Sequence, residues 1–163
     1  MIRHARAADR PAIDAVLAAA FGRIDEAELV GRLRADEDAM FELVAEEDGA
    51  IAGHVLYSRL WADRPELFAA LAPLAVRPER QASGLGSALV RASLDTAREF
   101  GCHGVLVLGD PAYYGRFGFS AEAAREVIAP YRGLAAFQAL GLEDGAFSRA
   151  ISITYPDAFS GGL

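Results

Sequence analysis

The feature that most constrains the fold is a short glycine-bearing turn, Gln81-Ala82-Ser83-Gly84-Leu85-Gly86. It follows the apolar run Leu67–Val76, typical of a buried strand, and it opens the amphipathic segment Leu85–Phe100, typical of a helix. The first N–H groups of a helix lack partners inside the helix, and the helix dipole adds positive potential at that end. Glycine also lets a ligand approach the backbone closely. The turn therefore predicts a binding site for a phosphate-bearing cofactor.

The segments around this turn predict two parallel strands joined by a helix. Gly104–Gly109 holds four consecutive apolar residues and predicts the second strand. Strand, helix and strand in this order form a right-handed crossover. Because Pro73 in the first strand cannot donate a ladder hydrogen bond, we expect a bulge or a local splaying of the sheet there. Pro111–Phe117 predicts a brief helix that begins at Asp110 as N-cap and is closed by Gly118.

Periodicity and turn residues predict two helices and a hairpin upstream of this unit. The chain is expected to begin with a strand at Ile2–Arg6, followed by a helix between Asp9 as N-cap and Gly22. A second helix opens with a capping box of Asp25 and Glu28. Strands at Phe41–Glu46 and Ile51–Ser58 are joined at Asp48-Gly49, and irregular chain follows over Arg59–Glu66.

The pattern is weaker beyond Phe119. We expect a loop or a short helix over Pro130–Gly145, a final strand over Ala146–Tyr155 and a frayed tail over Ser160–Leu163. Because no repeat or linker interrupts the sequence, we expect residues 1–163 to form a single mixed α/β domain.

Composition argues against several classes of function. The formal net charge of −7 is unfavourable for nucleic-acid binding, which relies on basic residues that release counterions. No apolar run approaches the ~20 residues of a membrane helix, and the N-terminus lacks the apolar core of a signal peptide, so we expect no membrane anchor and a cytoplasmic location. With Cys102 as the one cysteine and three scattered histidines, we expect no metal site. The absence of lysine excludes a Walker A loop, and Leu89 stands where a Rossmann fingerprint needs a small residue.

Two motifs together resemble the GCN5-related N-acetyltransferase family. The turn is similar to the family's Gln/Arg-x-x-Gly-x-Gly/Ala pyrophosphate loop, and Tyr114-Gly115-Arg116-Phe117-Gly118-Phe119 is similar to its Tyr-x-x-x-Gly-Phe ending. The motifs stand about thirty residues apart, which leaves room for the intervening helix and strand. The order of elements also resembles the family over nearly the whole chain, although the likeness is vague after Phe119.

The resemblance implies a fold in which a mixed, mostly antiparallel sheet is splayed between two parallel strands and flanked by helices. It implies acetyl-CoA (coenzyme A) as co-substrate, with the pantetheine arm between the splayed strands and the pyrophosphate on the loop amides. The residues expected to hold it are Leu74, Ala75, Val76, Gln81, Ala82, Ser83, Gly84, Leu85, Gly86, Ser87, Tyr113 and Phe117.

The activity that the resemblance implies is transfer of an acetyl group to a primary amine, on a small molecule or a protein, by direct attack in a ternary complex. Tyr114 matches the motif position of the acid that protonates the leaving thiolate, and Tyr113 is the alternative ring. The base stays open among Glu66, Glu79, His54 and ordered water. A non-catalytic acyl-CoA-binding or partner-binding module is the alternative function. Many members of the family are dimers, so the resemblance also makes a homodimer possible.

Overall fold

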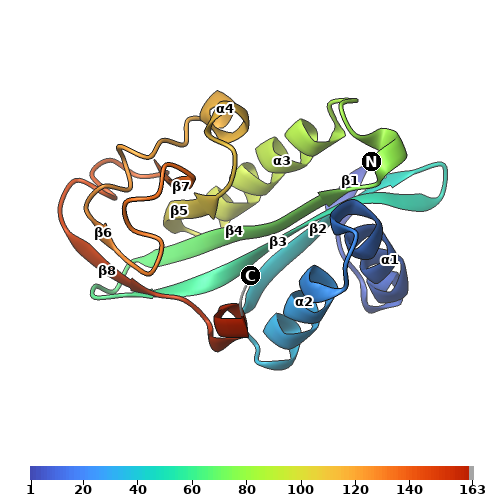
Figure 1. Ribbon diagram of the computed structural model, residues 1–163, viewed down its shortest axis with the longest axis horizontal. Coiled ribbons are helices and arrows are strands. Elements are labelled where there is room, and N and C mark those ends of the chain that lie inside the picture. Colours follow the sequence, from blue (N-terminus) through green and yellow to red (C-terminus); the bar gives the residue numbers. More distant parts are fainter. Residues whose placement is uncertain (162–163) are drawn as a thin grey trace.

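A central sheet with helices on both faces organises the chain, as the computed structural model shows for residues 1–161 (Figure 1). Helices α1 and α2 cover one face, α3 covers the other, and α4 lies on the α3 side beyond the end of β5. The helices are α1 (Arg10–Phe21), α2 (Asp25–Ala35), α3 (Leu85–Glu99) and α4 (Pro111–Tyr114). The strands are β1 (Ile2–His4), β2 (Ala39–Glu47), β3 (Ala50–Ala62), β4 (Leu67–Val76), β5 (Cys102–Leu108), β6 (Val127–Ile128), β7 (Phe137–Gly141) and β8 (Ile151–Thr154).

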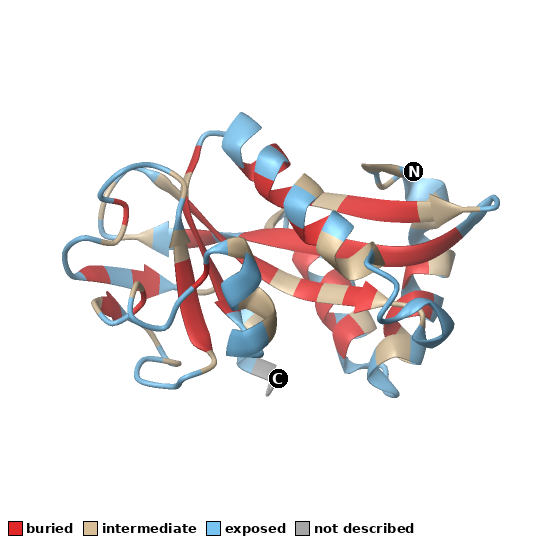
Figure 2. Cartoon of the chain, turned by 90° about the horizontal axis from the view of Figure 1, so that it is seen from above, coloured by how far each residue is buried: buried red, intermediate tan, exposed pale blue. Residues whose placement is uncertain are grey.

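The main sheet has the order β1-β2-β3-β4-β5-β7, and its neighbouring strands are antiparallel except for β4 and β5. Alternating side chains of the central strands enter two separate cores. Val55 and Tyr57 pack with the residues of α3, whereas Leu56 packs with those of α1 and α2. Because both faces are covered, β3 is buried along most of its length (Figure 2).

The parallel pair β4 and β5 separates partway along its length. Its pairing joins residues 67–70 of β4 to residues 102–106 of β5. Beyond this point β4 continues through residues 71–76 with β3 on one side and no strand of the described chain on the other. Strand β5 instead stays paired with β7 to its end, where Leu108 pairs with Phe137. The predicted splay is therefore confirmed, and it leaves one backbone edge of β4 free.

A bulge in β4 accompanies this separation. Val55 of β3 pairs with Leu74, and Tyr57 pairs with Leu71, so Ala72 and Pro73 together lie opposite a single β3 residue. An extra residue of this kind bends a strand and interrupts the ladder where a proline could not contribute an N–H group. The bulge predicted from Pro73 is confirmed, and it lies in the part of β4 whose opposite edge is free.

Two segments predicted to be irregular, loop or helix contain strands instead. The stretch expected to be irregular from Arg59 onward belongs to β3, because β4 pairs with it as far as Leu60 and β8 pairs with Trp61 and Ala62. The segment Phe137–Gly141, expected as loop or short helix, is strand β7. It completes the edge of β5, and this distant partner left no signal in the local sequence.

Several expected boundaries also differ. Asp9 precedes α1, but its carboxylate accepts hydrogen bonds from the Arg6 N–H and the Arg3 guanidinium instead of capping the helix. Asp25 lies inside α2 and forms no capping box. The final strand, Ile151–Thr154, is shorter than predicted. At the expected frayed tail, a short 3₁₀ helix covers Asp157–Gly161, and residues 162–163 lie outside the described residues.

Other local signals are confirmed. Gly22 ends α1 in the left-handed conformation with φ of 68°, and the Asp110 carboxylate caps α4 through the Ala112 N–H. None of the helices in residues 1–161 has both the length and the apolarity that crossing a lipid bilayer requires.

A partly buried ion-pair network ties α2 to the sheet. The Arg34 guanidinium donates two hydrogen bonds, of 2.9 and 2.8 Å, to the Glu42 carboxylate of β2. The Nε2 atom of the fully buried His54 lies 2.8 Å from the same carboxylate. Burial alone would raise the pKa of Glu42. The hydrogen bonds and charges of His54 and Arg34 lower this pKa by more than burial raises it, so the net pKa is about 2.

This network predicts an acid-dependent loss of stability. Because the pKa of Glu42 is lower in the folded than in the unfolded chain, its contribution is complete above the unfolded pKa of about 4.5 and is lost as pH falls toward 2. We expect Glu42→Gln to lower the free energy of unfolding by about 2 kcal/mol at pH 6, and the difference from wild type to shrink below pH 4.5. Urea denaturation between pH 3 and 7 measures it. Glu122→Gln, at an exposed pair with Arg125, is the control, and a difference independent of pH would contradict the assignment.

Candidate active site

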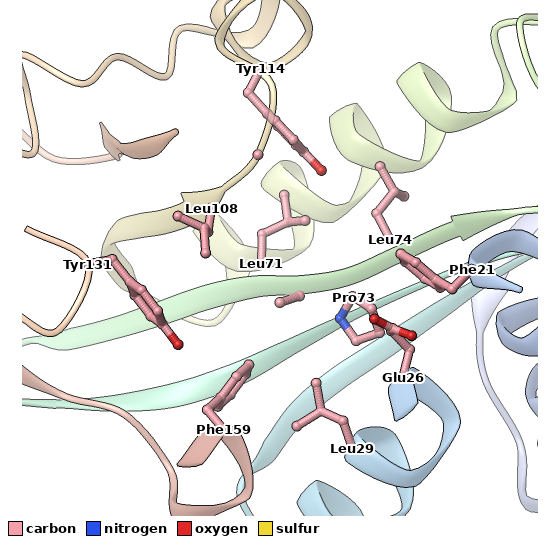
Figure 3. A pocket seen from close by; sticks show the side chains of 12 residues that line it. Phe21, Glu26, Leu29, Leu71, Pro73, Leu74, Leu108, Tyr114, Tyr131 and Phe159 are labelled. Carbon is pink, nitrogen blue, oxygen red and sulfur yellow. The ribbon is translucent and has the colours of Figure 1, made fainter. Parts of the chain in front are cut away.

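Two cavities open along the free edge of β4 and meet at Leu74. We call the first, of about 370 Å³, the loop cavity. We call the second, of about 240 Å³, the edge cavity. The loop cavity is lined by Leu74, Val76, Gln81, Ala82, Gly84, Gly86, Ser87, Tyr113 and Arg116. The edge cavity is lined by Phe21, Glu26, Leu29, Leu71, Ala72, Pro73, Leu74, Leu108, Gly109, Tyr114, Tyr131 and Phe159 (Figure 3).

The turn between β4 and α3 presents unpaired backbone donors to the loop cavity. Gly84, the N-cap of α3, has a left-handed φ of 88°, and no side chain of residues 1–161 caps this helix end. Ala82 also has a left-handed φ, of 59°, which is costly for a residue with a Cβ atom. The side-chain amide of Gln81 donates a hydrogen bond of 3.0 Å to the Val76 carbonyl oxygen and so ties the turn to the end of β4. The first N–H groups of α3 are thereby held open to an anionic ligand.

A close contact between α3 and α4 forms the far wall of the loop cavity. A Cβ atom on Gly86 would lie 2.8 Å from the Tyr113 hydroxyl oxygen, so a side chain at this position would have to displace that hydroxyl group. The Arg116 guanidinium lies over the Tyr113 ring, 4.7 Å from its centroid, and donates to the Ser87 hydroxyl at 2.9 Å. These contacts hold one positive charge beside the unpaired amides of the turn.

Arg116 is a residue that the sequence reasoning missed. It lies within the second motif, three residues after Tyr113 on a short helical turn, and residues with this spacing share one face. The signal was therefore present, but the motif pattern treats this position as variable.

Tyr114 projects from α4 into the edge cavity. Its ring packs edge-on against Tyr113 and Phe119, with centroid distances of 5.0 and 5.8 Å. Figure 3 shows its hydroxyl group pointing toward β4. Burial, and next the neighbouring Tyr113, raise the pKa of the phenol above its usual range. The hydroxyl therefore carries its proton at neutral pH and can act as a hydrogen-bond donor.

Glu26 brings a carboxylate to the wall of the edge cavity that α2 forms. The residue is 5% exposed, and Figure 3 shows its carboxylate directed toward Pro73 and Phe21. Arg23 compensates the charge, donating from Nε to Oε1 at 3.0 Å and from Nη2 to Oε2 at 2.5 Å. The edge cavity is thus bounded by a protonated phenol on the α4 side and by a carboxylate on the α2 side.

The sequence reasoning also missed Glu26, although a signal existed. Glu26, Leu29, Val30 and Leu33 follow the spacing i, i+3, i+4, i+7, and all four are buried. A charged residue in register with an apolar helical stripe indicates a carboxylate that faces the interior.

Eight of the twelve residues expected to hold a cofactor line the loop cavity, and Tyr114 lines the adjoining edge cavity. The other four lie close by but do not line it. Ala75 is buried on the α1 and α2 face, Leu85 packs into the core below α3, Ser83 is exposed, and Phe117 packs between Arg91 and Arg116.

The three side chains considered as a base do not line either cavity. Glu66 is exposed at the start of β4, and Glu79 is exposed 3.9 Å from Arg77. His54 is buried and bonded to Glu42. The structure therefore does not bring these residues together with Tyr114.

Comparisons with known proteins find a matching family and similar solved structures. The acetyltransferase (GNAT) family matches residues 10–119. A protein of Escherichia coli strain K12 described as uncharacterized N-acetyltransferase YhbS is 39% identical over 143 residues, which are 86% of this chain and 86% of that protein. The crystal structure of YhbS from Escherichia coli in complex with CoA has a TM-score of 0.92 at 35% identity, covering 100% of this chain and 93% of that one. A GNAT family acetyltransferase from Brucella melitensis in complex with acetyl-CoA has a TM-score of 0.82 at 33% identity, covering 98% and 97%.

The packing of Tyr114 predicts the effect of a single methyl group. A Cβ atom on Gly109 would lie 2.5 Å from Cε2 of the Tyr114 ring, so Gly109→Ala must displace that ring. We expect a loss of about 1–3 kcal/mol in unfolding free energy, as is usual for overpacking, together with a changed near-UV tyrosine signal. Gly115→Ala, where nothing lies within 4 Å, is the control for denaturation and circular dichroism. Equal effects of the two substitutions would contradict the proposed contact.

Proposed function

The chain belongs to the acetyltransferase (GNAT) family and acts with acetyl-CoA, and on this premise we propose that it acetylates a primary amine by direct attack in a ternary complex. The amine is carried by a small molecule or a protein, and the reaction uses no metal. The observation that carries the proposal is the meeting of the loop cavity and the edge cavity at Leu74, with the Tyr114 phenol in the wall of the latter.

The loop cavity is the proposed site of the cofactor's pyrophosphate. The unpaired N–H groups at the start of α3 and the Arg116 guanidinium provide donors and positive charge there. The pantetheine arm then follows the free edge of β4, whose backbone groups over residues 74–76 can pair with its amides. This path passes Leu74 and brings the thioester into the edge cavity.

The chemistry proposed in the edge cavity is acyl transfer through a tetrahedral intermediate. A neutral amine nitrogen bonds to the thioester carbon, and a backbone N–H of residues 74–76 stabilises the oxygen that becomes negative. The intermediate then releases the sulfur as a thiolate, which takes a proton from the Tyr114 hydroxyl, and the phenolate regains a proton from ordered water. Burial raises the pKa of the phenol, and the same apolar cavity raises that of a leaving thiolate, so the thiolate stays basic enough to accept the proton.

The proton that the amine loses is assigned to ordered water. Glu66, Glu79 and His54 were the side chains considered for this step, and none of them lines the edge cavity. The relatives are described as N-acetyltransferases, which favours an enzyme over the alternative of a non-catalytic binding module. The cytoplasmic location and the homodimer stay predictions of the sequence.

Removal of the Tyr114 hydroxyl tests its assigned role. We expect Tyr114→Phe to lower kcat about 10²–10⁴-fold, the usual worth of one placed proton donor, with little change in the affinity for CoA. The control is Tyr155→Phe, which removes another phenol. Burial raises the pKa of Tyr155 too, but this residue lines neither cavity. Steady-state kinetics with thiol detection and calorimetric titration of CoA give the two quantities. Normal turnover of Tyr114→Phe would remove the phenol from the mechanism.

Loss of the Arg116 charge tests the placement of the pyrophosphate. We expect Arg116→Gln to weaken CoA binding about tenfold at low salt, because a charge-assisted contact to phosphate is lost. The effect should shrink in high salt, which screens this exposed group. Arg98→Gln removes a charge from the other end of α3 and serves as control in the same titrations. An equal effect of both variants would indicate general electrostatics rather than a contact.

A further inference from the structure

The walls of the edge cavity are apolar apart from three side-chain polar groups. These are the Glu26 carboxylate and the hydroxyl groups of Tyr114 and Tyr131. Figure 3 shows Glu26 on α2 near Phe21, whereas Tyr131 and Phe159 lie on the opposite side of the cavity. The volume of about 240 Å³ suits a compact ligand. A ligand with many polar groups would lose more hydrogen bonds to water than these three side chains could replace.

The ion pair of Glu26 leaves the carboxylate able to bind a second cation. Arg23 places one N–H on each oxygen, and each oxygen of a carboxylate has a further lone pair. Arg23 itself is half exposed, with 51% of its side chain accessible, so it approaches from the solvent side. The remaining acceptor capacity is available to a group inside the cavity.

Arg23 does not require a buried partner. It also lies 3.8 Å from the exposed Asp25 carboxylate, which could pair with it at the helix surface. Burying a carboxylate on the apolar face of α2 is costly, because a charge loses its hydration there. The position of Glu26 therefore points to a cation that enters the edge cavity.

We propose that the acceptor is a primary amine on a compact apolar body and that Glu26 binds its ammonium group. This inference rests on the proposed function, which assigns the edge cavity to the acceptor. Glu26 accepts a charge-assisted hydrogen bond from the ammonium, while the side chains of Leu29, Leu71 and Phe159 bury the hydrocarbon part. The ammonium then gives one proton to ordered water, and the neutral nitrogen attacks the thioester. The acceptor is thereby held on the α2 side of β4, opposite the Tyr114 hydroxyl.

The same geometry disfavours two other classes of amine. An aminosugar would bring several hydroxyl groups into a cavity whose described walls offer them few partners. A polyamine would bring a second ammonium, and Glu26 is the one carboxylate that lines the cavity among residues 1–161. In a series of n-alkylamines, each added methylene should lower KM roughly fourfold until the cavity is filled.

The experiment compares two apolar amines, 2-phenylethylamine and n-hexylamine, with spermidine and glucosamine. Acetyl transfer is followed by thiol release, and binding of 2-phenylethylamine to the CoA-saturated protein is measured separately by calorimetry. We expect the apolar amines to have at least tenfold higher kcat/KM than the polar ones. Higher kcat/KM for spermidine or glucosamine would overturn the inference.

Single substitutions test whether the Glu26 carboxylate is the group that binds the amine. We expect Glu26→Gln to raise the KM and the Kd for 2-phenylethylamine about 10–100-fold while leaving the KM for acetyl-CoA unchanged. Glu28→Gln removes an equal charge from the exposed face of the same helix and should change neither value. Arg23→Gln should change the Kd for 2-phenylethylamine by less than threefold. If the Glu26 carboxylate served only to pair with Arg23, Arg23→Gln and Glu26→Gln would instead change this Kd equally. Thermal unfolding of each variant with CoA reports whether it is folded.

The outcomes separate this inference from the proposed function. Glu26-dependent binding of 2-phenylethylamine without acetylation of any amine would contradict the proposed function and support the acceptor site. Acetylation of some amine, with the same 2-phenylethylamine binding in Glu26→Gln, in Glu28→Gln and in wild type, would support the proposed function and overturn the inference. Absence of binding by both apolar amines would also overturn it.

Discussion

The interruption of pairing between β4 and β5 is the constraint on which the rest of the structure depends. Parallel pairing ends after residue 70 of β4, and residues 71–76 keep β3 as their one strand partner within the described chain. Had β5 followed β4 to its end, its side chains and backbone would fill the space that both cavities occupy. Two local features accompany the separation, the bulge at Pro73 and the pairing of β5 with β7. Backbone groups that a closed sheet would satisfy are thereby left to a ligand.

Polar groups from both helical layers lie beside the free edge of β4, so that the edge is flanked by groups that can take part in the reaction. The α3 and α4 layer supplies unpaired amides, the Arg116 charge and the Tyr114 phenol, whose pKa burial raises. The layer of α1 and α2 supplies the Glu26 carboxylate, whose charge Arg23 compensates. A thioester on the edge would therefore meet a proton donor from one side and an amine held by a carboxylate from the other.

Elements with local signals could be predicted from the sequence, and those that depend on distant partners could not. The bounds of β4 follow from a continuous apolar run, and the splay follows from Pro73 together with the parallel crossover. By contrast, the end of β3 and the whole of β7 depend on neighbours far along the chain. The loop residues were found because a motif marks them, whereas Glu26 was missed because its role depends on which cavity α2 faces.

The central claim is that CoA occupies the free edge of β4 and the amides of the following turn. Hydrogen–deuterium exchange with and without saturating CoA measures this directly, because bound backbone N–H groups exchange more slowly. The account predicts that CoA protects amides of residues 74–76 and 82–87, while amides of β1 and β2 keep their rates. Unchanged exchange in these two segments, at a CoA concentration that saturates binding, would contradict it.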